Sequence, residues 1–320
     1  MQEREIIERF FNLSQTADDA ILTSIGDDAA VISVSSDQQL VVSVDTLIEN
    51  IHFPKGTSAF DIGYKAVAVN LSDLAAMGAL PKWMTLALSL PTFDEQWLQQ
   101  FSDGMFTLLN KHQVSLIGGD ISRGPLSMTL QAHGLVAEGA AILRSTAKPD
   151  DIIYVSGELG SATLALHVLQ QKVELDKSDL ANILPALNRP VPQVALGLAL
   201  RGIATAMLDL SDGLINDVPK ILAASHCGAD IDLQKLPVNN ILSDMMGGQA
   251  SSQYAFIGGD DYQLCFTVPP EKRCIIEALR KKLKVRLTEI GKINNKDELI
   301  LLNSALSYAE LKTNSFQHFS

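Results

Sequence analysis

The chain has few cysteines and few aromatic side chains. Three of its 320 residues are cysteine, and aromatic residues make up 6% of the sequence. Cys227, Cys265 and Cys274 lack the spacing of a metal site and cannot all pair with one another, so we expect reduced thiols in a cytoplasmic protein. With so few aromatics, Ala, Val, Ile and Leu must fill the core, as is usual in α/β proteins.

Long uninterrupted apolar runs are also missing. The stretches 66–80 and 194–208 are interrupted by Asn70, Asp73 and Arg201, and neither reaches the roughly 18 apolar residues that a membrane span needs. The first five residues lack the basic and then apolar order of an export signal. The sequence therefore predicts no membrane association.

Basic residues are fewer than acidic residues. The formal net charge is −12, which disfavours a broad nucleic-acid or anionic-membrane surface, because both require a positive field. The basic run over residues 281–286 is expected to be a solvated helix end. An acidic protein that binds a polyanionic substrate needs metal ions between the like charges.

Three common binding motifs do not occur. The sequence contains no Gly-x-x-x-x-Gly-Lys-Ser/Thr loop, and no Gly-x-Gly-x-x-Gly follows a predicted strand. Regular Asp-x-Asp-x-Asp-Gly loops, which a structural Ca²⁺-binding protein would carry, are missing too. Any nucleotide site must therefore belong to another fold.

The sequence does contain aspartates at the ends of apolar segments. They occur in six motifs, several with flanking glycines: Gly26-Asp27-Asp28, Val44-Asp45-Thr46, Asn70-Leu71-Ser72-Asp73, Gly118-Gly119-Asp120, Leu208-Asp209-Leu210-Ser211-Asp212 and Gly258-Gly259-Asp260-Asp261. One aspartate at such a place is usually a turn residue or helix cap. Six together predict a pocket for Mg²⁺ and phosphate, because carboxylates suit this hard cation and substrate phosphates share its shell.

Length and pattern predict an α/β (α+β) protein with two domains. A 320-residue chain is long for a single core, and strand-like and helical segments alternate along it. The best boundary is the Pro-containing segment 148–151, which interrupts both periodicities. We therefore expect an N-terminal domain over residues 1–148 and a C-terminal domain over residues 149–320.

Periodicity and breakers predict the individual elements. Residues 29–34 and 40–45 are expected to form paired strands, and residues 60–77 a helix that ends at Gly78. Further strands are expected at 83–90, 114–117, 127–136, 152–155, 205–208 and 254–257, and further helices at 5–13, 94–112 and 162–169.

Two of these strands, 114–117 and 254–257, run into a Gly-Gly-Asp sequence, which suggests similar architecture in the two halves. Residues 156–161 form a Gly-containing turn between a strand and a helix. Such a helix start can bind an anion.

Taken in order, the aspartate motifs resemble those of the thiamine-monophosphate kinases, a family in the superfamily of aminoimidazole ribonucleotide synthetase and selenophosphate synthetase. The resemblance is carried by Gly26-Asp27-Asp28-Ala29-Ala30, Val44-Asp45-Thr46-Leu47 with His52-Phe53, Asn70–Ala79, Gly118-Gly119-Asp120, Leu208–Leu214 and Gly258–Tyr262. It extends from Ile25 to His318-Phe319, and the motifs are specific as a set.

The resemblance implies a two-domain fold like that of aminoimidazole ribonucleotide synthetase, and a homodimer whose N-terminal sheets join into a shared barrel. The N-terminal domain would bind ATP and Mg²⁺, and the C-terminal domain would complete the nucleotide and substrate site. ATP and thiamine monophosphate would meet in a cleft between the domains and give ADP and thiamine diphosphate.

Carried over position by position, the resemblance implies three sets of site residues. Several Mg²⁺ ions would be bound by Asp28, Ser43, Val44 through its carbonyl, Asp45, Asp73, Asp120, Asp209 and Asp212, of which Asp45, Asp73 and Asp120 would be catalytic. ATP would be held by Gly119, Asp120, Arg144 and Ser211, and thiamine monophosphate by His52, Asp260 and Phe316. An arginine suits a phosphate fork, and an aromatic ring suits stacking on a heteroaromatic substrate.

The chain departs from the family pattern at Asp260. The family motif Gly-Gly-Glu-Asp-Tyr-Glu is here Gly258-Gly259-Asp260-Asp261-Tyr262-Gln263, so the acidic contact is one methylene shorter. His52 has a second interpretation, as a histidine of the core.

The expected chemistry is direct in-line phosphoryl transfer. The acceptor phosphate is already ionised, so neither a strong general base nor a phosphoenzyme is required. The nearest alternative is another ATP-using member of the same superfamily that acts on a different substrate. A two-metal phosphatase is a further alternative, and it would release phosphate from a monoester without ATP.

Overall fold

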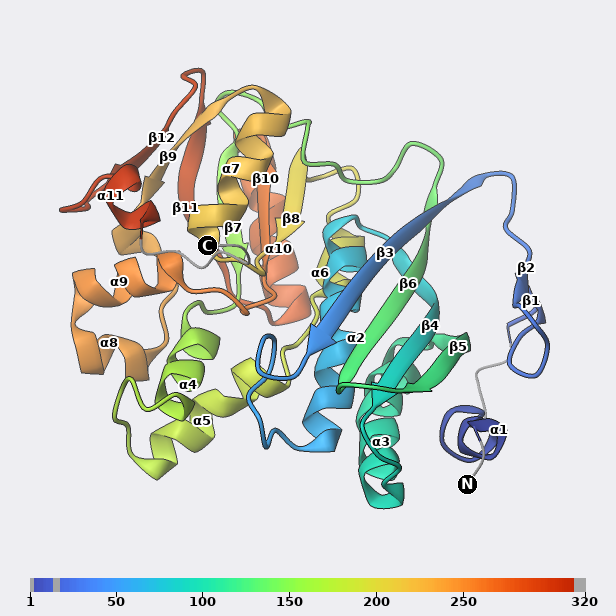
Figure 1. Ribbon diagram of the computed structural model, residues 1–320. Coiled ribbons are helices and arrows are strands. Elements are labelled where there is room, and N and C mark those ends of the chain that lie inside the picture. Colours follow the sequence, from blue (N-terminus) through green and yellow to red (C-terminus); the bar gives the residue numbers. More distant parts are fainter. Residues whose placement is uncertain (1–2, 14–17, 314–320) are drawn as a thin grey trace. The chain divides into compact units, whose positions relative to one another are not determined.

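The computed structural model describes residues 3–13 and 18–313 of the chain (Figure 1). It divides into two compact units. The first comprises Met1–Leu74 and Ala79–Ala140, and the second comprises Ala75–Gly78 and Ala141–Ser320. The predicted mixed α/β class is confirmed, whereas the domain boundary between residues 148 and 149 stays a prediction.

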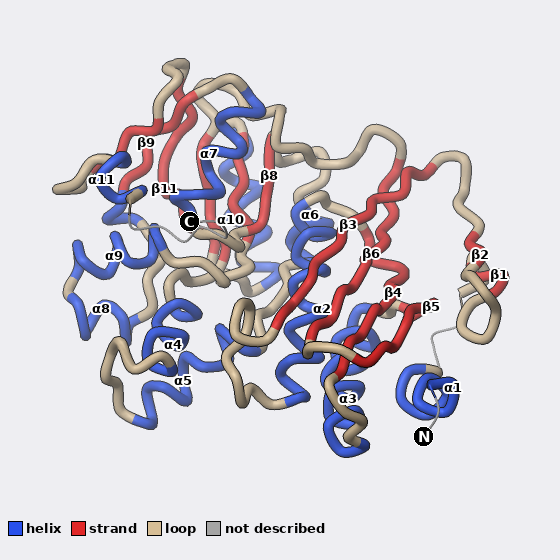
Figure 2. Tube along the Cα trace, in the orientation of Figure 1, coloured by secondary structure: helices blue, strands red, loops and turns tan. Residues whose placement is uncertain are grey.

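The first unit is built on a four-stranded sheet with the strand order β3-β6-β4-β5 (Figure 2). Strands β4 and β5 are parallel, and the other two pairs are antiparallel. Its elements are α1 (Glu3–Ile6), the π-helical turn η1 (Ile7–Phe11), β1 (Ile21–Thr23), β2 (Val31–Ile32), β3 (Gln38–Ile48), α2 (Ala59–Ala76), β4 (Leu80–Leu90), α3 (Glu95–His112), β5 (Ser115–Arg123) and β6 (Ser127–Ala137). The last two residues of α2 belong to the second unit.

Helices α2 and α3 cover one face of this sheet (Figure 1). Asp94 caps α3 by accepting a hydrogen bond from the Trp97 backbone N–H at 3.0 Å. Gly78 follows α2 with a φ of 63°, as predicted, because a left-handed residue at this position ends a helix most easily when it is glycine.

The two helices approach so closely that only glycine fits at two positions. A Cβ atom on Gly63 would lie 2.1 Å from the carbonyl oxygen of Phe101, and one on Gly104 would lie 2.0 Å from that of Phe60. The crossing is therefore a contact of backbone with backbone, and close packing leaves no room for a methyl group.

The strand pair β1–β2 packs on the sheet near Trp83. Ile21 and Ile32 pack against a buried cluster that contains Trp83, which is fully buried. The Asp18 carboxylate accepts a hydrogen bond from the indole N–H of Trp83 at 3.1 Å and pairs with the Lys82 ammonium at 3.0 Å. These contacts hold the segment that leads into the first aspartate motif.

The second unit contains a six-stranded sheet with the order β12-β9-β11-β7-β10-β8. Strands β9 and β12 are parallel, and all other neighbours are antiparallel. Its strands are β7 (Ile152–Ser156), β8 (Ala206–Asp209), β9 (Gly228–Asp232), β10 (Leu264–Val268), β11 (Leu287–Asn294) and β12 (Leu299–Leu302).

Helices surround the sheet of the second unit. They are α4 (Ser161–Leu169), α5 (Lys177–Asn188), α6 (Val194–Ala199), α7 (Leu214–Ser225), η2 (Leu233–Lys235), α8 (Asn240–Met246), α9 (Gly248–Ile257), η3 (Pro270–Lys272), α10 (Arg273–Leu283) and α11 (Tyr308–Lys312). Strands β7, β8 and β10 are buried along their whole length, and their side chains form one core with α4, α5, α7 and α9. Among the helices of the described ranges, none is long and apolar enough to span a membrane.

Three predictions about strands are wrong. Residues 31–32 pair with β1, whereas β3 pairs with β6. Residues 254–257 are the end of helix α9, and Gly118-Gly119-Asp120 lies inside β5, not after it. The two Gly-Gly-Asp sequences therefore do not mark equivalent places in similar halves.

Candidate active site

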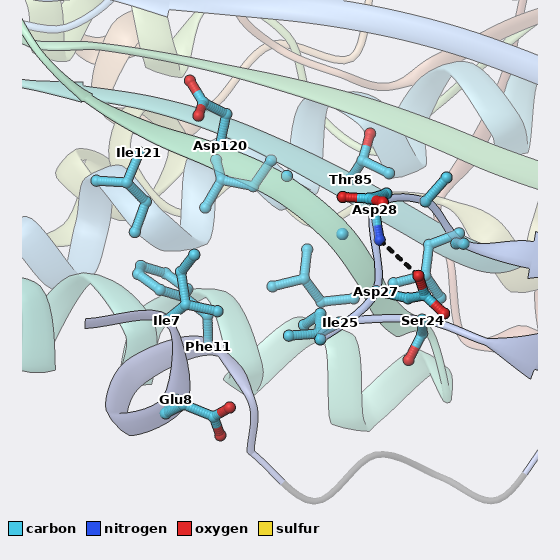
Figure 3. Close-up of a pocket in the computed structure, with 18 of the residues that line it drawn as sticks. Ile7, Glu8, Phe11, Ser24, Ile25, Asp27, Asp28, Thr85, Asp120 and Ile121 are labelled. Atoms are coloured by element: carbon cyan, nitrogen blue, oxygen red, sulfur yellow. Dashed lines mark hydrogen bonds between the residues drawn. The ribbon is translucent and has the colours of Figure 1, made fainter. Parts of the chain in front are cut away.

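A cavity of about 620 Å³ lies in the first unit (Figure 3). It is bordered by the N-terminal helical segment, residues 24–30, and strands β4 and β5. Asp28, Gly119 and Asp120 all line it. The Asp28 backbone N–H donates to the carboxylate of Asp27 at 2.8 Å, which fixes the turn of the first motif. The structure thus brings together three predicted site residues from two distant motifs.

Gly119 is required by the pairing of β5 with β4. A Cβ atom on this residue would lie 1.9 Å from the carbonyl oxygen of Leu86 on the neighbouring strand. The next residue, Asp120, pairs with Ala87, and both side chains are exposed. Because alternate residues face opposite sides of a strand, the Asp120 side chain lies on the face of the sheet opposite to the buried Leu86 side chain.

The second and third motifs meet between β3 and α2. The hydroxyl of Ser43 donates to the carboxylate of Asp73. Asp45 lies two residues further along β3 and so on the same face as Ser43. The Val44 side chain points to the opposite face and is 58% exposed. It contains no oxygen, so only the backbone carbonyl of this residue can serve as an oxygen ligand.

His52 is held in the turn that follows β3. Its Nδ1 accepts a hydrogen bond from the Ile48 backbone N–H at 3.1 Å, and its own backbone N–H donates to the Ile48 carbonyl at 3.0 Å. The ammonium of Lys65, a residue that is 3% exposed, donates to the His52 carbonyl at 3.3 Å. Because Nδ1 is an acceptor, the neutral imidazole carries its proton on Nε2.

Two loops of the second unit lie side by side. They are the loop after β8, residues 209–213, and the loop after α9, residues 258–263. Three backbone hydrogen bonds of 2.8 Å join them: Leu210 N–H to Gln263 O, Tyr262 N–H to Leu210 O, and Asp260 N–H to Ser211 O. Glycines make this approach possible, since a Cβ atom on Gly259 would lie 2.5 Å from the Ser211 carbonyl oxygen. The loops bring together the predicted site residues Asp209, Ser211, Asp212 and Asp260.

Lys220 on α7 links Asp212 to a buried carboxylate. Its ammonium donates to Asp212 at 2.9 Å and to Asp217 at 2.7 Å. Asp217 is 1% exposed and also accepts the Asp212 backbone N–H at 3.0 Å. Burial raises the pKa of Asp217 although Lys220 opposes the shift. Burial alone would lower the pKa of Lys220, but its bonds to Asp212 and Asp217 outweigh this and raise it, so the ammonium stays charged.

Asp261 was not predicted from the sequence as a site residue. Its carboxylate accepts the Gly160 backbone N–H, with distances of 3.1 and 3.0 Å to its two oxygens, at the first turn of α4. The helix start that was expected to be able to bind an anion is therefore occupied by a side chain of the chain itself. Burial raises the pKa of Asp261 well above its usual range, while the hydrogen bond from Gly160 acts in the opposite direction. The doubled aspartate after Gly258-Gly259 was the available signal in the sequence.

Two predicted residues remain to be placed. Arg144 is exposed in the second unit, and its carbonyl accepts the Ser225 hydroxyl at 2.7 Å. Phe316 lies outside the described residues.

The described ranges contain no group of three or more His, Cys, Asp or Glu side chains arranged to hold a metal ion. The predicted ligands instead form small sets within each unit, such as Asp28 with Asp120 and Ser43 with Asp73. An ion bound by such a set would take one or two carboxylates and complete its shell with water and phosphate oxygens. Mg²⁺ is commonly bound in this way.

Comparisons with known proteins identify the family of the chain. Residues 26–136 match the family AIR synthase related protein, N-terminal domain, and residues 148–302 match the corresponding C-terminal domain. The chain is 45% identical to the thiamine-monophosphate kinase of Haemophilus influenzae, over 92% of this chain and 90% of that protein. It is also 45% identical to that of Escherichia coli K12, over 91% and 90%.

Solved structures show the same relationship. A thiamine-monophosphate kinase from Stenotrophomonas maltophilia K279a matches with a TM-score of 0.85 and 45% identity, over 90% of this chain and 93% of that one. A structure described as AaThiL complexed with AMPPCP and TMP matches with a TM-score of 0.76 and 27% identity, over 84% and 85%. Since both domains and nearly the whole length match, the chain belongs to the thiamine-monophosphate kinase family of the AIR synthase-related proteins.

Proposed function

We propose that this protein transfers the γ-phosphoryl group of ATP to thiamine monophosphate, forming ADP and thiamine diphosphate. The observation that carries the proposal is the meeting of Asp28, Gly119 and Asp120 at one cavity, in a chain 45% identical to a kinase of this name. The related structure with AMPPCP, an analogue of ATP, and TMP supports this pair of ligands.

Mg²⁺ is the metal that fits the side chains present. Carboxylates and a serine hydroxyl are hard oxygen ligands, and the exposed Asp28 and Asp120 border one cavity. In this proposal the ions are held by Asp28, Ser43, the Val44 carbonyl, Asp45, Asp73, Asp120, Asp209 and Asp212. When bound, Mg²⁺ neutralises charge on the phosphate oxygens.

Besides binding the metal ions, the protein must align two anionic substrates, ATP and thiamine monophosphate. In direct in-line transfer, an oxygen of the acceptor phosphate forms a bond to the γ-phosphorus as the bond to the ADP oxygen breaks, so no proton has to be removed. We propose that residues 1–148 supply most of the ATP and Mg²⁺ ligands. Residues 149–320 then complete the nucleotide and substrate site through Ser211 and Asp260, while Arg144 belongs to the first segment.

The substrate contacts follow from the chemistry of each side chain. The Nδ1 atom of His52 accepts a backbone N–H, so its Nε2–H is the group that donates to a phosphate oxygen of thiamine monophosphate. The Asp260 carboxylate complements the positive thiazolium ring of thiamine. Phe316 completes the proposal as a ring that stacks on the substrate.

We also propose a homodimer, supported by strand β3. This edge strand of the four-stranded sheet exposes Leu40, Val42 and Val44 by 47, 48 and 58%. The three residues are two positions apart, so their side chains lie on the same face of the strand and form one apolar stripe. An isolated unit rarely leaves such a stripe exposed to solvent. Val42→Glu should yield a monomer in sedimentation velocity, whereas Val191→Glu, at a residue that is 52% exposed in the other unit, should remain dimeric. A dimeric Val42→Glu variant would contradict this assignment.

We propose a cytoplasmic location because all three cysteines are free thiols, as is usual in a reducing compartment.

The direct test is incubation of the purified chain with ATP, Mg²⁺ and thiamine monophosphate, followed by chromatographic identification of the products. We expect equimolar ADP and thiamine diphosphate, loss of activity with a chelator, and recovery when Mg²⁺ is added back. Phosphate release without ATP would indicate a phosphatase. Turnover of an aminoimidazole precursor in place of thiamine monophosphate would indicate another activity of the superfamily.

A further inference from the structure

The turn that carries Asp260 has an unusual backbone. Asp260 and Tyr262 have φ values of 65° and 48°, in the left-handed region that residues other than glycine rarely adopt. Aspartate tolerates this region better than most residues, but a bulky tyrosine does so at a cost in free energy. Two such residues within three positions persist only when the surrounding structure holds the turn in place.

The start of helix α4 supplies that restraint on one side of the turn. The Asp261 carboxylate, in a residue 8% exposed, accepts the Gly160 backbone N–H at 3.1 and 3.0 Å. One turn further along α4, the Thr163 hydroxyl donates to the Gly259 carbonyl at 3.0 Å. Both bonds connect α4 to residues immediately beside Asp260.

The loop after β8 holds the opposite side. Asp260 N–H donates to Ser211 O, and Tyr262 N–H donates to Leu210 O, each at 2.8 Å. The backbone on either side of Asp261 is thus bound to one loop, while its side chain is bound to α4. Asp261 is buried and Asp260 is half-buried, so two consecutive carboxylates have different environments.

We propose that Asp261 is a positioning residue: its carboxylate, bound at the start of α4, holds the turn in the conformation that presents Asp260 to thiamine monophosphate. The inference rests on the proposed function and on Asp260 as a substrate contact. Asp261 touches no substrate in this assignment. Its effect arises because a displacement of about 1 Å can cost up to about 100-fold, and at a residue that binds the substrate we expect this cost in the KM.

The test compares steady-state kinetics of Asp261→Ala and Asp261→Asn with the wild type. Without the carboxylate, the Gly160 N–H loses its acceptor and the turn can relax. We expect Asp261→Ala to raise the KM for thiamine monophosphate at least about tenfold and to change the KM for ATP less than about twofold. Asp261→Asn keeps one oxygen acceptor and should give an intermediate KM.

Asp176→Ala is the matched control. Asp176 caps α5 in the same unit by accepting the Asp179 backbone N–H at 2.8 Å, but it lies outside the turn. Its loss should lower the Tm, as a lost helix cap does, and leave both KM values unchanged. This control separates general destabilisation from misplacement of Asp260.

Thr163→Val keeps the test decisive if Asp261→Ala does not fold. The substitution removes the bond to the Gly259 carbonyl while nearly preserving side-chain volume, and we expect a two- to threefold rise in the KM for thiamine monophosphate. An unchanged KM in folded Asp261→Ala, or in Thr163→Val when the former is insoluble, overturns the proposal. An equal rise in both substrates' KM values also overturns it.

The failure of the proposed function is distinguishable from the failure of this inference. A wild type that forms no thiamine diphosphate overturns the function itself. If the wild type is active but Asp260→Ala leaves the KM for thiamine monophosphate unchanged, Asp260 is not a substrate contact and the role of Asp261 is refuted with it. If Asp260→Ala raises that KM and Asp261→Ala does not, only the positioning role fails.

Discussion

Gly104→Ala tests the crossing of α2 and α3. The new methyl group would lie 2.0 Å from the Phe60 carbonyl oxygen, well inside the 3.0 Å that real Cβ atoms respect. Helix propensity favours alanine over glycine by about 1 kcal/mol. Overpacking typically costs about 1–3 kcal/mol, and more where backbone must move. Because a helical carbonyl cannot rotate away, the helices must separate, and we expect a net loss of about 2 kcal/mol.

The assay is thermal unfolding followed by circular dichroism. At about 2–4 °C per kcal/mol for a protein of this class, the Tm of Gly104→Ala should fall by about 4–8 °C. Gly248→Ala is the control, because Gly248 begins α9 and has no heavy atom within 4 Å of the added Cβ. It should leave the Tm unchanged or raise it slightly. A Gly104→Ala variant that melts as high as Gly248→Ala would refute the reasoning.

Three further predictions concern charge. Burial lowers the pKa of three histidines, His112, His133 and His167, so the unfolded chain takes up protons first. The stability that these groups contribute above about pH 6.5 should then be lost as the pH falls, by up to about 1.4 kcal/mol per histidine and pH unit. In urea unfolding across pH 5–7.5, the free energy of unfolding should depend less steeply on pH once all three histidines are replaced by glutamine. Lys220→Met leaves Asp217 buried without its cation. We expect a loss of about 3 kcal/mol in the free energy of unfolding, at the low end for a broken buried pair because Lys220 is partly exposed. A Tm equal to that of Lys220→Arg would contradict this. Asp73→Asn should lower kcat at least about 100-fold at unchanged Tm, and normal activity with unchanged Mg²⁺ dependence would exclude a metal role.

Local features were the ones that the sequence predicted well. Helix α2 with its end at Gly78 follows from apolar periodicity and a glycine stop, and α3 from periodicity over residues 94–112. These signals lie within a few residues of the structure that they determine.

Pairing between distant segments was not predicted correctly. The alternation in residues 38–48 indicates a strand but does not identify β6 as its partner, because the partner is set by packing across the sheet. The run 254–257 is short and apolar, and periodicity alone does not separate a strand from the end of a helix.

The candidate site shows the same contrast between local signals, which the sequence contains, and distant partners, which it does not identify. The aspartate motifs predict a set of site residues, and the structure groups several of them at one cavity and along two adjoining loops. The role of Asp261 depends on Gly160, roughly 100 residues earlier in the chain. No pattern within the Gly258–Gln263 motif contains that partner, so only the fold reveals it.

The loops 209–213 and 258–263 are joined by backbone hydrogen bonds, and Asp260 contributes its N–H to them, not its carboxylate. The left-handed backbone at position 260 suits aspartate, which adopts this conformation more readily than most residues other than glycine. An Asp260 variant should therefore keep the three backbone hydrogen bonds between the loops and change only the side chain that we propose as a substrate contact.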